Sequence, residues 1–377
     1  MALTKPNVTI DEKKKTKILL IRPDRIGDVV LSTPVIAAIK HYYPNAEVYF
    51  LVRDHVLPVV KHNALLSGIL VYYPYTTHKG FSGFWKLLKE IRKHKFQIAI
   101  TLQVSFFVSM AMFYSGIRYR IGPYSKWYSF FIFNRGIRQA RSTVEMHEAD
   151  YNLMLLRRIG IRVPSRQFQP NITVDAEAKQ RMREFLKKEG LEESTPFVVV
   201  HPGMGGSALN WPEGYYVDLI QRILTRSIPV LVTGSVTEKI MVDRVVLASK
   251  SHDPKNLLHF FLGALSHTGL EDFIALLSLT KVVIAPSTGA LHIGLALGKP
   301  TVSFFSPIKV QSALRWGPYT EEDEKNSVLV PDALCGQDYK CAGRRCHFYF
   351  CMERLSVEEA FQNVLGQLGT NREKIFV

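Results

Sequence analysis

Short apolar segments alternate with longer amphipathic segments over most of the chain. Residues 16–23 are apolar and rich in β-branched side chains, residues 29–44 have helical spacing, and residues 46–54 are again strand-like. A strand, a helix and a second strand in this order predict a βαβ unit with a parallel sheet. The alternation continues through residues 69–73, 81–94 and 96–102. The first half of the chain is therefore predicted to be one doubly wound α/β domain.

The apolar rhythm lapses in residues 159–190, a stretch with Pro, Arg and Asn that ends in an amphipathic helix. A second βα series follows and closes with the strand at residues 300–307. We therefore expect two α/β domains. The predicted organisation is a flexible tail (1–16), a first domain (17–172), a second domain (173–352) and a C-terminal helix that packs back toward the first domain (353–377).

Residues 96–117 form the longest apolar stretch, and they permit two interpretations. A membrane-spanning helix needs about 20 mostly apolar residues, which this stretch barely supplies. The β-branched beginning and the polar Gln97 and Gln103 instead favour a buried strand, a turn and a helix. The N-terminus is polar and lysine-rich, with no apolar core of a secretion signal, so a cytoplasmic location is expected.

The chain carries a large positive charge, because 48 Lys and Arg residues oppose 33 Asp and Glu residues, giving a net charge of +15. Such a field favours nucleic acids, phosphosugars or acidic membranes as partners. Nothing in the sequence resembles a nucleic-acid-binding motif, so no such partner is expected. Residues 118–141 contain six cations, no carboxylate and several aromatic side chains: Trp127, Tyr128, Phe130, Phe131 and Phe133. This segment fits either a membrane interface or a core helix with a solvated basic rim.

Three loops carry candidate chemistry. In the first, residues 22–28, Asp28 can act as a base or cap the following helix, and Arg22 and Arg25 suit an anionic substrate or are surface arginines. In the second, residues 201–213, three glycines expose amides that can hold phosphate, although a flexible loop is the simpler interpretation. In the third, residues 285–292, a helix start offers an anion site, and His292 is either a ligand or a core histidine.

The four cysteines all lie late in the chain, at Cys335, Cys341, Cys346 and Cys351. Zinc sites prefer tighter pairs, so this spacing allows either a structural zinc site or buried, reversibly oxidised thiols.

Taken together, the three loops resemble glycosyltransferase family nine, the lipopolysaccharide heptosyltransferases. The family's R-x-x-x-x-G-D segment corresponds to residues 22–28, its H-P-G to W-P run to residues 201–212, and its (D/S)-(S/T)-G-x-x-H element to residues 287–292. The resemblance covers about residues 17–368. It implies a GT-B fold, in which two Rossmann-like domains with parallel sheets face each other across a cleft.

The resemblance also implies a reaction and its residues. Asp28 would be the general base of an inverting, metal-independent transfer of heptose from ADP-heptose, without a cofactor. The donor residues would be Gly203, Gly205, Gly206, Ser207, Asn210, Glu238, Ser287, Thr288, Gly289 and His292. The acceptor residues would be Arg22, Arg25, Arg118 and Arg120. The acceptor would be an anionic glycolipid of the lipid A-Kdo core type, reached by a monomer attached peripherally to the inner face of the cytoplasmic membrane.

Two positions depart from the family pattern. Many members have Lys or Arg where this chain has Leu209, and heptosyltransferases often have Asp where it has Ser287. Two alternatives therefore stay open: a family-nine transferase that uses another nucleotide sugar for a surface polysaccharide or glycolipid, and a non-catalytic paralogue that binds sugar nucleotides.

Overall fold

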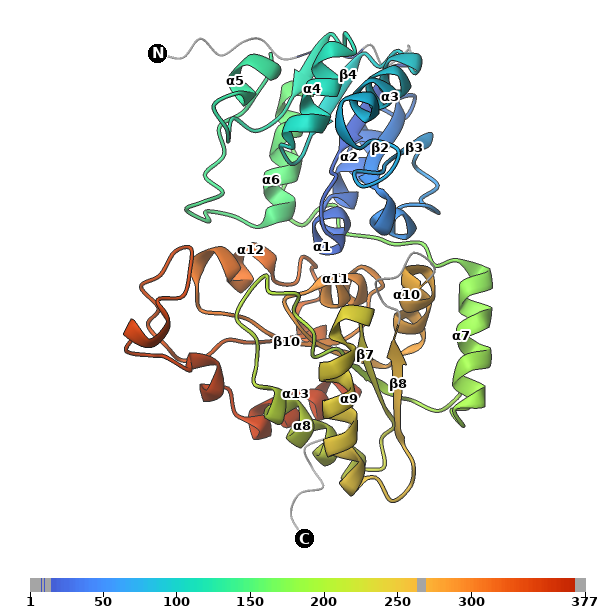
Figure 1. Cartoon of the computed structure of the whole chain (residues 1–377), viewed down its shortest axis with the longest axis vertical. Coiled ribbons are helices and arrows are strands. Elements are labelled where there is room, and N and C mark those ends of the chain that lie inside the picture. The colour runs from blue at the N-terminus through green and yellow to red at the C-terminus, as the bar shows by residue number, and fades with distance from the viewer. Residues whose placement is uncertain (1–7, 9, 11–14, 263–268, 370–377) are drawn as a thin grey trace. The chain divides into compact units, whose positions relative to one another are not determined.

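The computed structural model describes residues 8, 10, 15–262 and 269–369 (Figure 1). The chain divides into two compact units. The first contains residues 1–141 and 145–173, and the second contains residues 142–144 and 174–377. The main division falls after Thr173, next to the predicted boundary after Ile172.

The first unit is built on a five-stranded parallel sheet in the order β3-β2-β1-β4-β5. Its strands are β1 (Lys17–Ile21), β2 (Glu47–Arg53), β3 (Gly68–Tyr72), β4 (Ile98–Thr101) and β5 (Tyr119–Ile121). In such an order the connections run in opposite directions on either side of β1, and the loops that follow β1 and β4 diverge there. This is where α/β sheets bind ligands, and the loop that carries Asp28 begins at this point.

Helices and turns connect these strands. They are α1 (Ile26–Val30), α2 (Thr33–Tyr42), η1 (Asp54–Val59), α3 (Gly80–Lys93), α4 (Phe106–Tyr114), α5 (Ser129–Ile132), α6 (Glu148–Met154) and η2 (Leu155–Ile159). The single helix expected at residues 29–44 is two helices. Pro34 has no N–H to donate to Val30, and the Thr33 hydroxyl donates to the Val30 carbonyl instead (2.8 Å).

The apolar stretch at residues 96–117 forms the strand β4, a turn and the helix α4, as the second interpretation predicted. None of the helices in the described ranges combines the length and the apolar composition that a bilayer-crossing segment requires.

The second unit contains a six-stranded parallel sheet in the order β11-β10-β9-β6-β7-β8. Its strands are β6 (Val198–Val200), β7 (Val230–Gly234), β8 (Leu258–Leu262), β9 (Val282–Pro286), β10 (Thr301–Phe304) and β11 (Asn326–Leu329). The α-helices are α7 (Ala176–Lys188), α8 (Glu213–Thr225), α9 (Lys239–Ser249), α10 (Gly269–Leu279), α11 (Gly289–Ala296), α12 (Ala313–Trp316) and α13 (Val357–Leu368). Short 3-10 turns are η3 (Val236–Glu238), η4 (Lys250–His252), η5 (Lys309–Gln311), η6 (Asp323–Lys325), η7 (Gly343–Arg345) and η8 (Cys351–Arg354).

The C-terminal helix α13 packs differently from our expectation. We predicted that it packs back toward the first domain, but its apolar face is buried against α8 and strands β9, β10 and β11 of the second unit. Trp211, just before α8, donates its indole N–H to the Leu355 carbonyl at the entry to this helix (2.9 Å). The helix is thus an integral part of the second core.

Candidate functional site

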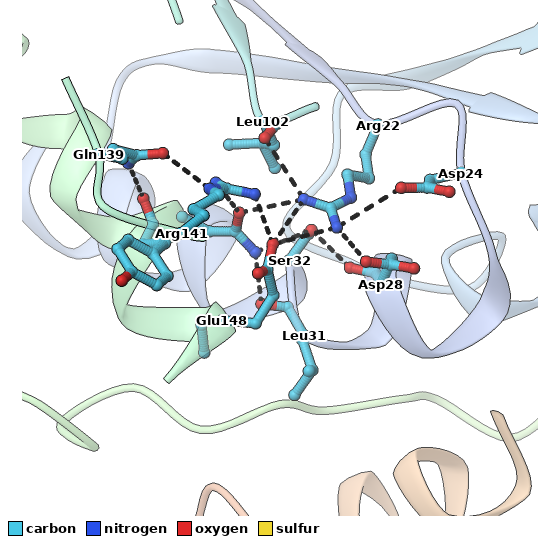
Figure 2. A network of polar contacts seen from close by, with 12 residues as sticks. Arg22, Asp24, Asp28, Leu31, Ser32, Leu102, Gln139, Arg141 and Glu148 are labelled. Carbon is cyan, nitrogen blue, oxygen red and sulfur yellow. Dashed lines mark hydrogen bonds and ion pairs between the residues drawn. The ribbon is translucent and has the colours of Figure 1, made fainter. Parts of the chain in front are cut away.

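Arg22 follows β1 directly and lies almost completely buried in the first unit. Its guanidinium group is the centre of a polar network (Figure 2). Nη2 donates to Asp28 and Glu148 (3.2 Å to Glu148), and Nη1 donates to Glu148 and Asn152, each at 3.2 Å. Asp24 lies 3.6 Å from Nη2. Burying a guanidinium group requires such compensation, and Arg22 obtains it from three carboxylates and an amide.

Asp28 lies on the short helix α1, with its side chain 14% exposed. Burial raises the pKa of its carboxyl group from 3.8 to about 6, although the adjacent Arg22 opposes the rise. Asp24 and Glu148 add to the rise because their negative charges disfavour a further anion. A carboxylate with this pKa is mostly ionised at neutral pH and is a stronger base than an ordinary aspartate.

Sequence reasoning missed the residues that complete this network. Glu148 is fully buried on α6 and also accepts a hydrogen bond from Arg141 (2.5 Å). Asn152, one turn further along α6, accepts from both arginines and donates to the Leu31 carbonyl (3.1 Å). The only sequence signal was a buried-helix pattern containing a carboxylate, which does not identify a partner more than a hundred positions away.

The four predicted acceptor-binding arginines fall into two groups. Arg25 and Arg118 are exposed. Arg22 is instead occupied within the network, and Arg120 donates to the carbonyls of Ile132 (2.8 Å) and Ile117 (2.7 Å). Both Nη atoms of Arg22 and two of the three side-chain nitrogens of Arg120 thus have internal acceptors, so these two arginines have a structural role, and acceptor binding by the four arginines stays a prediction.

The glycine loop of the second unit follows β6. Gly205 and Gly206 are exposed and have positive φ angles of 58° and 72°, which other residues adopt at a cost. Ser207, also exposed, donates to the Met204 carbonyl (3.1 Å). Asn210, a predicted donor residue, makes internal contacts in the structure. It donates to the Pro202 carbonyl (2.7 Å) and accepts from Tyr216 (3.0 Å).

Glu238 connects this loop to the segment after β7. It accepts hydrogen bonds from the Ser235 amide (2.9 Å) and hydroxyl (2.7 Å). A Cβ atom on Gly203 would lie 2.2 Å from its Oε1, so a larger residue there requires the Glu238 side chain or the loop to move. Burial alone would raise the pKa of Glu238, but hydrogen bonds from Ser235 and the nearby His201 lower it below its ordinary value. The carboxylate therefore stays ionised near the exposed glycines.

The third loop ends at the start of α11. Thr288 is the N-cap residue in an extended conformation, and its side chain does not cap the helix. The first-turn amides that begin at Gly289 therefore have no intrahelical acceptor, as at any helix start. The Thr288 hydroxyl is buried and makes no hydrogen bond within the described structure, and Ser287 is half-buried beside it. His292 is buried one turn further, with its ring 6.5 Å from that of Trp316. This arrangement suits an anion.

The four cysteines line one mostly apolar cavity of about 290 Å³, next to Leu209 and Asn210. All four are free, half-buried thiols. Burial is the main cause that raises the pKa of the Cys351 thiol, and the electrostatic interaction with the other three cysteines adds to the rise. Among the residues that the structure describes, no three His, Cys, Asp or Glu side chains are arranged to hold a metal ion. The structural zinc site and the buried, reversibly oxidised thiols therefore both stay predictions.

Comparisons with known proteins agree with this architecture. Residues 84–342 match the model of glycosyltransferase family 9 (heptosyltransferase). A Haemophilus influenzae protein is 27% identical over 84% of this chain and 89% of its own length, and its name describes a glycosyltransferase but states no substrate. Lipooligosaccharide heptosyltransferase 2 of Haemophilus ducreyi is 22% identical over 83% of this chain and 88% of its own length.

Two solved structures have the same fold. A family 9 glycosyltransferase from Veillonella parvula has a TM-score of 0.82 at 18% identity, covering 97% of this chain and all of that one. Escherichia coli ADP-heptose lipopolysaccharide heptosyltransferase II has a TM-score of 0.74 at 17% identity, covering 94% and 98%. The two parallel-sheet units thus form a GT-B fold, the architecture of many sugar-nucleotide-dependent glycosyltransferases. The chain belongs to glycosyltransferase family 9.

Proposed function

We propose that this glycosyltransferase transfers a heptose from ADP-heptose to the inner core of a lipopolysaccharide precursor, with inversion at the anomeric carbon. The observation that carries the proposal is Asp28, a buried carboxylate of raised pKa after the central strand of a family 9 fold. The names of relatives support heptose and lipopolysaccharide as donor group and acceptor.

Asp28 accepts the proton of the acceptor hydroxyl as that oxygen attacks the anomeric carbon, and the bond from this carbon to the ADP oxygen breaks. The leaving ADP gains negative charge. In this proposal the amides at the start of α11 and in the glycine loop of residues 203–206 stabilise that charge. Residues of the second domain thereby take the place of a divalent metal, and no cofactor takes part.

The acceptor is a lipid-linked anion, so we propose that the first domain docks on an anionic membrane through residues 118–141, the basic aromatic segment. Trp127 and Phe131 are 76% and 75% exposed. The cations Arg118, Lys126 and Arg138 are exposed as well. Arg141 is excluded from this surface because it pairs with Glu148, and Phe133 is buried. The remaining side chains have the composition of a membrane-interface segment.

The reaction is tested by measuring ADP release from ADP-heptose with an isolated core acceptor. The Asp28→Asn variant should lose about 10²–10⁴-fold in turnover, and Asp218→Asn, the same change at an exposed site in α8, should not. The wild-type rate should fall below about pH 6, where Asp28 takes up its proton. Activity should also survive EDTA.

Four results would contradict parts of this proposal. Near-normal turnover in Asp28→Asn would remove its role as base. Loss of activity in EDTA that Mg²⁺ restores would show that the amides do not suffice. Turnover with a different nucleotide sugar, and none with ADP-heptose, would replace heptose as the donor group. Binding of ADP without ADP release from any nucleotide sugar would mean that the protein is a non-catalytic binding protein.

A further inference from the structure

Two carboxylates accept hydrogen bonds from the Arg22 guanidinium group, and one of them, Asp28, is the proposed base. Nη2 of Arg22 donates to Asp28 and also to Glu148, while Nη1 donates to Glu148 alone of the two. Figure 2 shows Arg22 between the Asp24 and Asp28 side and the α6 side of the network. Arg141, which lies in the segment before α6, donates to the same Glu148 oxygen (2.5 Å). The charges therefore alternate: Asp28, Arg22, Glu148, Arg141.

A second set of contacts from α6 holds the short helix that carries Asp28. Helix α1 has five residues, and no side chain caps its N-terminus. Asn152 donates to the Leu31 carbonyl and to the Ser32 hydroxyl (3.3 Å), and that hydroxyl donates to the Asp28 carbonyl (2.7 Å). A helix this short has little stability of its own, so α6 supplies much of what keeps α1 in place.

The charges around Asp28 within the first unit can be assigned. Arg22 stabilises its anion, and Asp24 and Glu148 destabilise it. On η1, which packs against α1, Asp54 and His55 pair with each other (3.7 Å). Because Glu148 takes part of the hydrogen-bonding capacity of Arg22, that cation is only partly available to Asp28. An undivided Arg22–Asp28 pair would make Asp28 a weaker base.

We propose that Glu148 is a positioning residue for Asp28: by sharing Arg22, it orients the Asp28 carboxylate and preserves its ability to accept a proton, while Asn152 of the same helix anchors α1. The inference rests on the proposed role of Asp28 as base. Arg141 is the counterion that allows Glu148 to stay charged in a buried position. Arg22, Glu148 and Arg141 all act through Asp28 and need not touch the substrate.

The alternating charges predict opposite effects for two substitutions. Glu148→Gln removes the competing anion, so the pKa of Asp28 should fall by on the order of one unit. Arg141→Gln removes a nearby cation and leaves Arg22 as the remaining arginine partner of Glu148. Arg22 then stabilises the Asp28 anion less, so the pKa of Asp28 should rise. Turnover should decrease roughly ten-fold in Glu148→Gln, with the acid limb of its pH profile moved to lower pH.

The pKa of Asp28 is measured directly by titrating carboxyl carbons in protein labelled with ¹³C at aspartate, with Asp28→Asn identifying the resonance. The matched control is Asp150→Asn, the same charge change on the same helix, where the carboxylate accepts from Ser165 (2.9 Å). This control should leave the Asp28 titration unchanged. Glu148→Asp, which keeps the charge, should keep the Asp28 pKa closer to that of the wild type than Glu148→Gln does.

The titration separates this inference from the proposed function, because it needs no substrate. If Asp28→Asn keeps its activity, the proposed role of Asp28 as base fails whatever the titration gives. If the Asp28 pKa is the same in every folded variant, or moves in one direction for both Glu148→Gln and Arg141→Gln, the positioning role is wrong. Should Glu148→Gln not fold, Arg141→Gln and Glu148→Asp still decide the question.

Discussion

At the scale of single residues, the site combines a buried cation with several carboxylates, and the protein does not stabilise the charged form of every one of them. Arg22 is strongly stabilised as a cation, because its neighbours more than offset the cost of burial. Asp28 instead pays for its burial, since its pKa lies well above 3.8 despite the ion pair with Arg22. An enzyme that needs a base in this position accepts that cost.

This cost predicts that Asp28→Asn stabilises the protein at neutral pH while removing activity. The folded state binds more protons than the unfolded state between about pH 4 and 6, so stability falls as pH rises through that window. Each pKa unit corresponds to about 1.4 kcal/mol, so the shift from 3.8 to about 6 corresponds to at most about 3 kcal/mol. Arg22 keeps Glu148 and Asn152 as acceptors in the variant.

Thermal unfolding should therefore begin several degrees higher in Asp28→Asn than in the wild type at pH 7.5. The difference should disappear at pH 4 and below, where the wild-type carboxyl group is protonated as well. A lower unfolding temperature of the variant at pH 7.5 would mean that the ion pair with Arg22 outweighs the burial of Asp28.

The sequence placed Asp28 at the ligand edge of the sheet because its loop follows a strand and precedes a helix, and only the family resemblance predicted that Asp28 is the base. It did not identify the role of Arg22, which we predicted to bind the acceptor. A buried and an exposed arginine look alike in sequence, and the difference lies in Glu148 and Asn152, whose approach depends on tertiary packing. Long-range partners of this kind leave no local periodicity.

At the scale of elements, the second domain places two loops against each other through Glu238 and Gly203. Glu238 caps its own 3-10 turn by accepting from Ser235, and the glycine loop closes over its carboxylate. If this loop binds the donor diphosphate, its amides must stay in the positions that they have when Gly203 packs against the Glu238 carboxylate.

Gly203→Ala should therefore weaken ADP binding about ten-fold, because the new Cβ would lie 2.2 Å from Oε1 and 2.4 Å from Cδ of Glu238. Either Glu238 or the loop must move. Calorimetric titration with ADP measures the loss. Gly214→Ala in α8 is the matched control, since nothing lies within 4 Å of its added Cβ and helix propensity favours alanine. If the two variants bind ADP with equal affinity, the loop at Gly203 takes no part in donor binding.

Long elements were predictable and short ones were not. Strands β1, β2 and β3 and helices α3 and α13 all lie where the sequence analysis placed them. Strand β5 has three residues and β11 four, which is too few for a period to emerge. Helices α5 and α12, with four residues each, were missed for the same reason. Both strands lie at the edges of their sheets.

At the scale of the whole molecule, the net charge of +15 is distributed so that some cations are structural and others are exposed. The basic aromatic segment illustrates this division. Arg120 and Arg141 are held by internal acceptors, whereas Arg118, Lys126 and Arg138 remain exposed near Trp127 and Phe131. Arg138 lies over the ring of Phe130, with 5.7 Å from its Cζ to the ring centroid. The sequence predicted the composition of this surface but not which cations belong to it.

Replacing Arg118, Lys126 and Arg138 together with Gln should weaken binding to anionic liposomes. Each cation near such a surface contributes about 1 kcal/mol, so three correspond to a loss of up to about 100-fold at low salt. The control carries the same charge change on the second unit, at the exposed Lys187, Lys188 and Lys250. Co-sedimentation with liposomes at several salt concentrations measures both variants.

Because the three replaced cations lie outside the Arg22 network and only Arg118 among them is a predicted acceptor residue, transfer to a soluble, truncated acceptor should slow less than transfer to a membrane-embedded acceptor. Raising the salt concentration should reduce liposome binding of the wild type toward that of the variant, since screening acts on the exposed charges. If the first-unit variant and the second-unit control lose liposome binding equally, overall charge rather than this segment attracts the membrane. If neither loses it, residues 118–141 are no docking surface and their exposed aromatic side chains require another explanation.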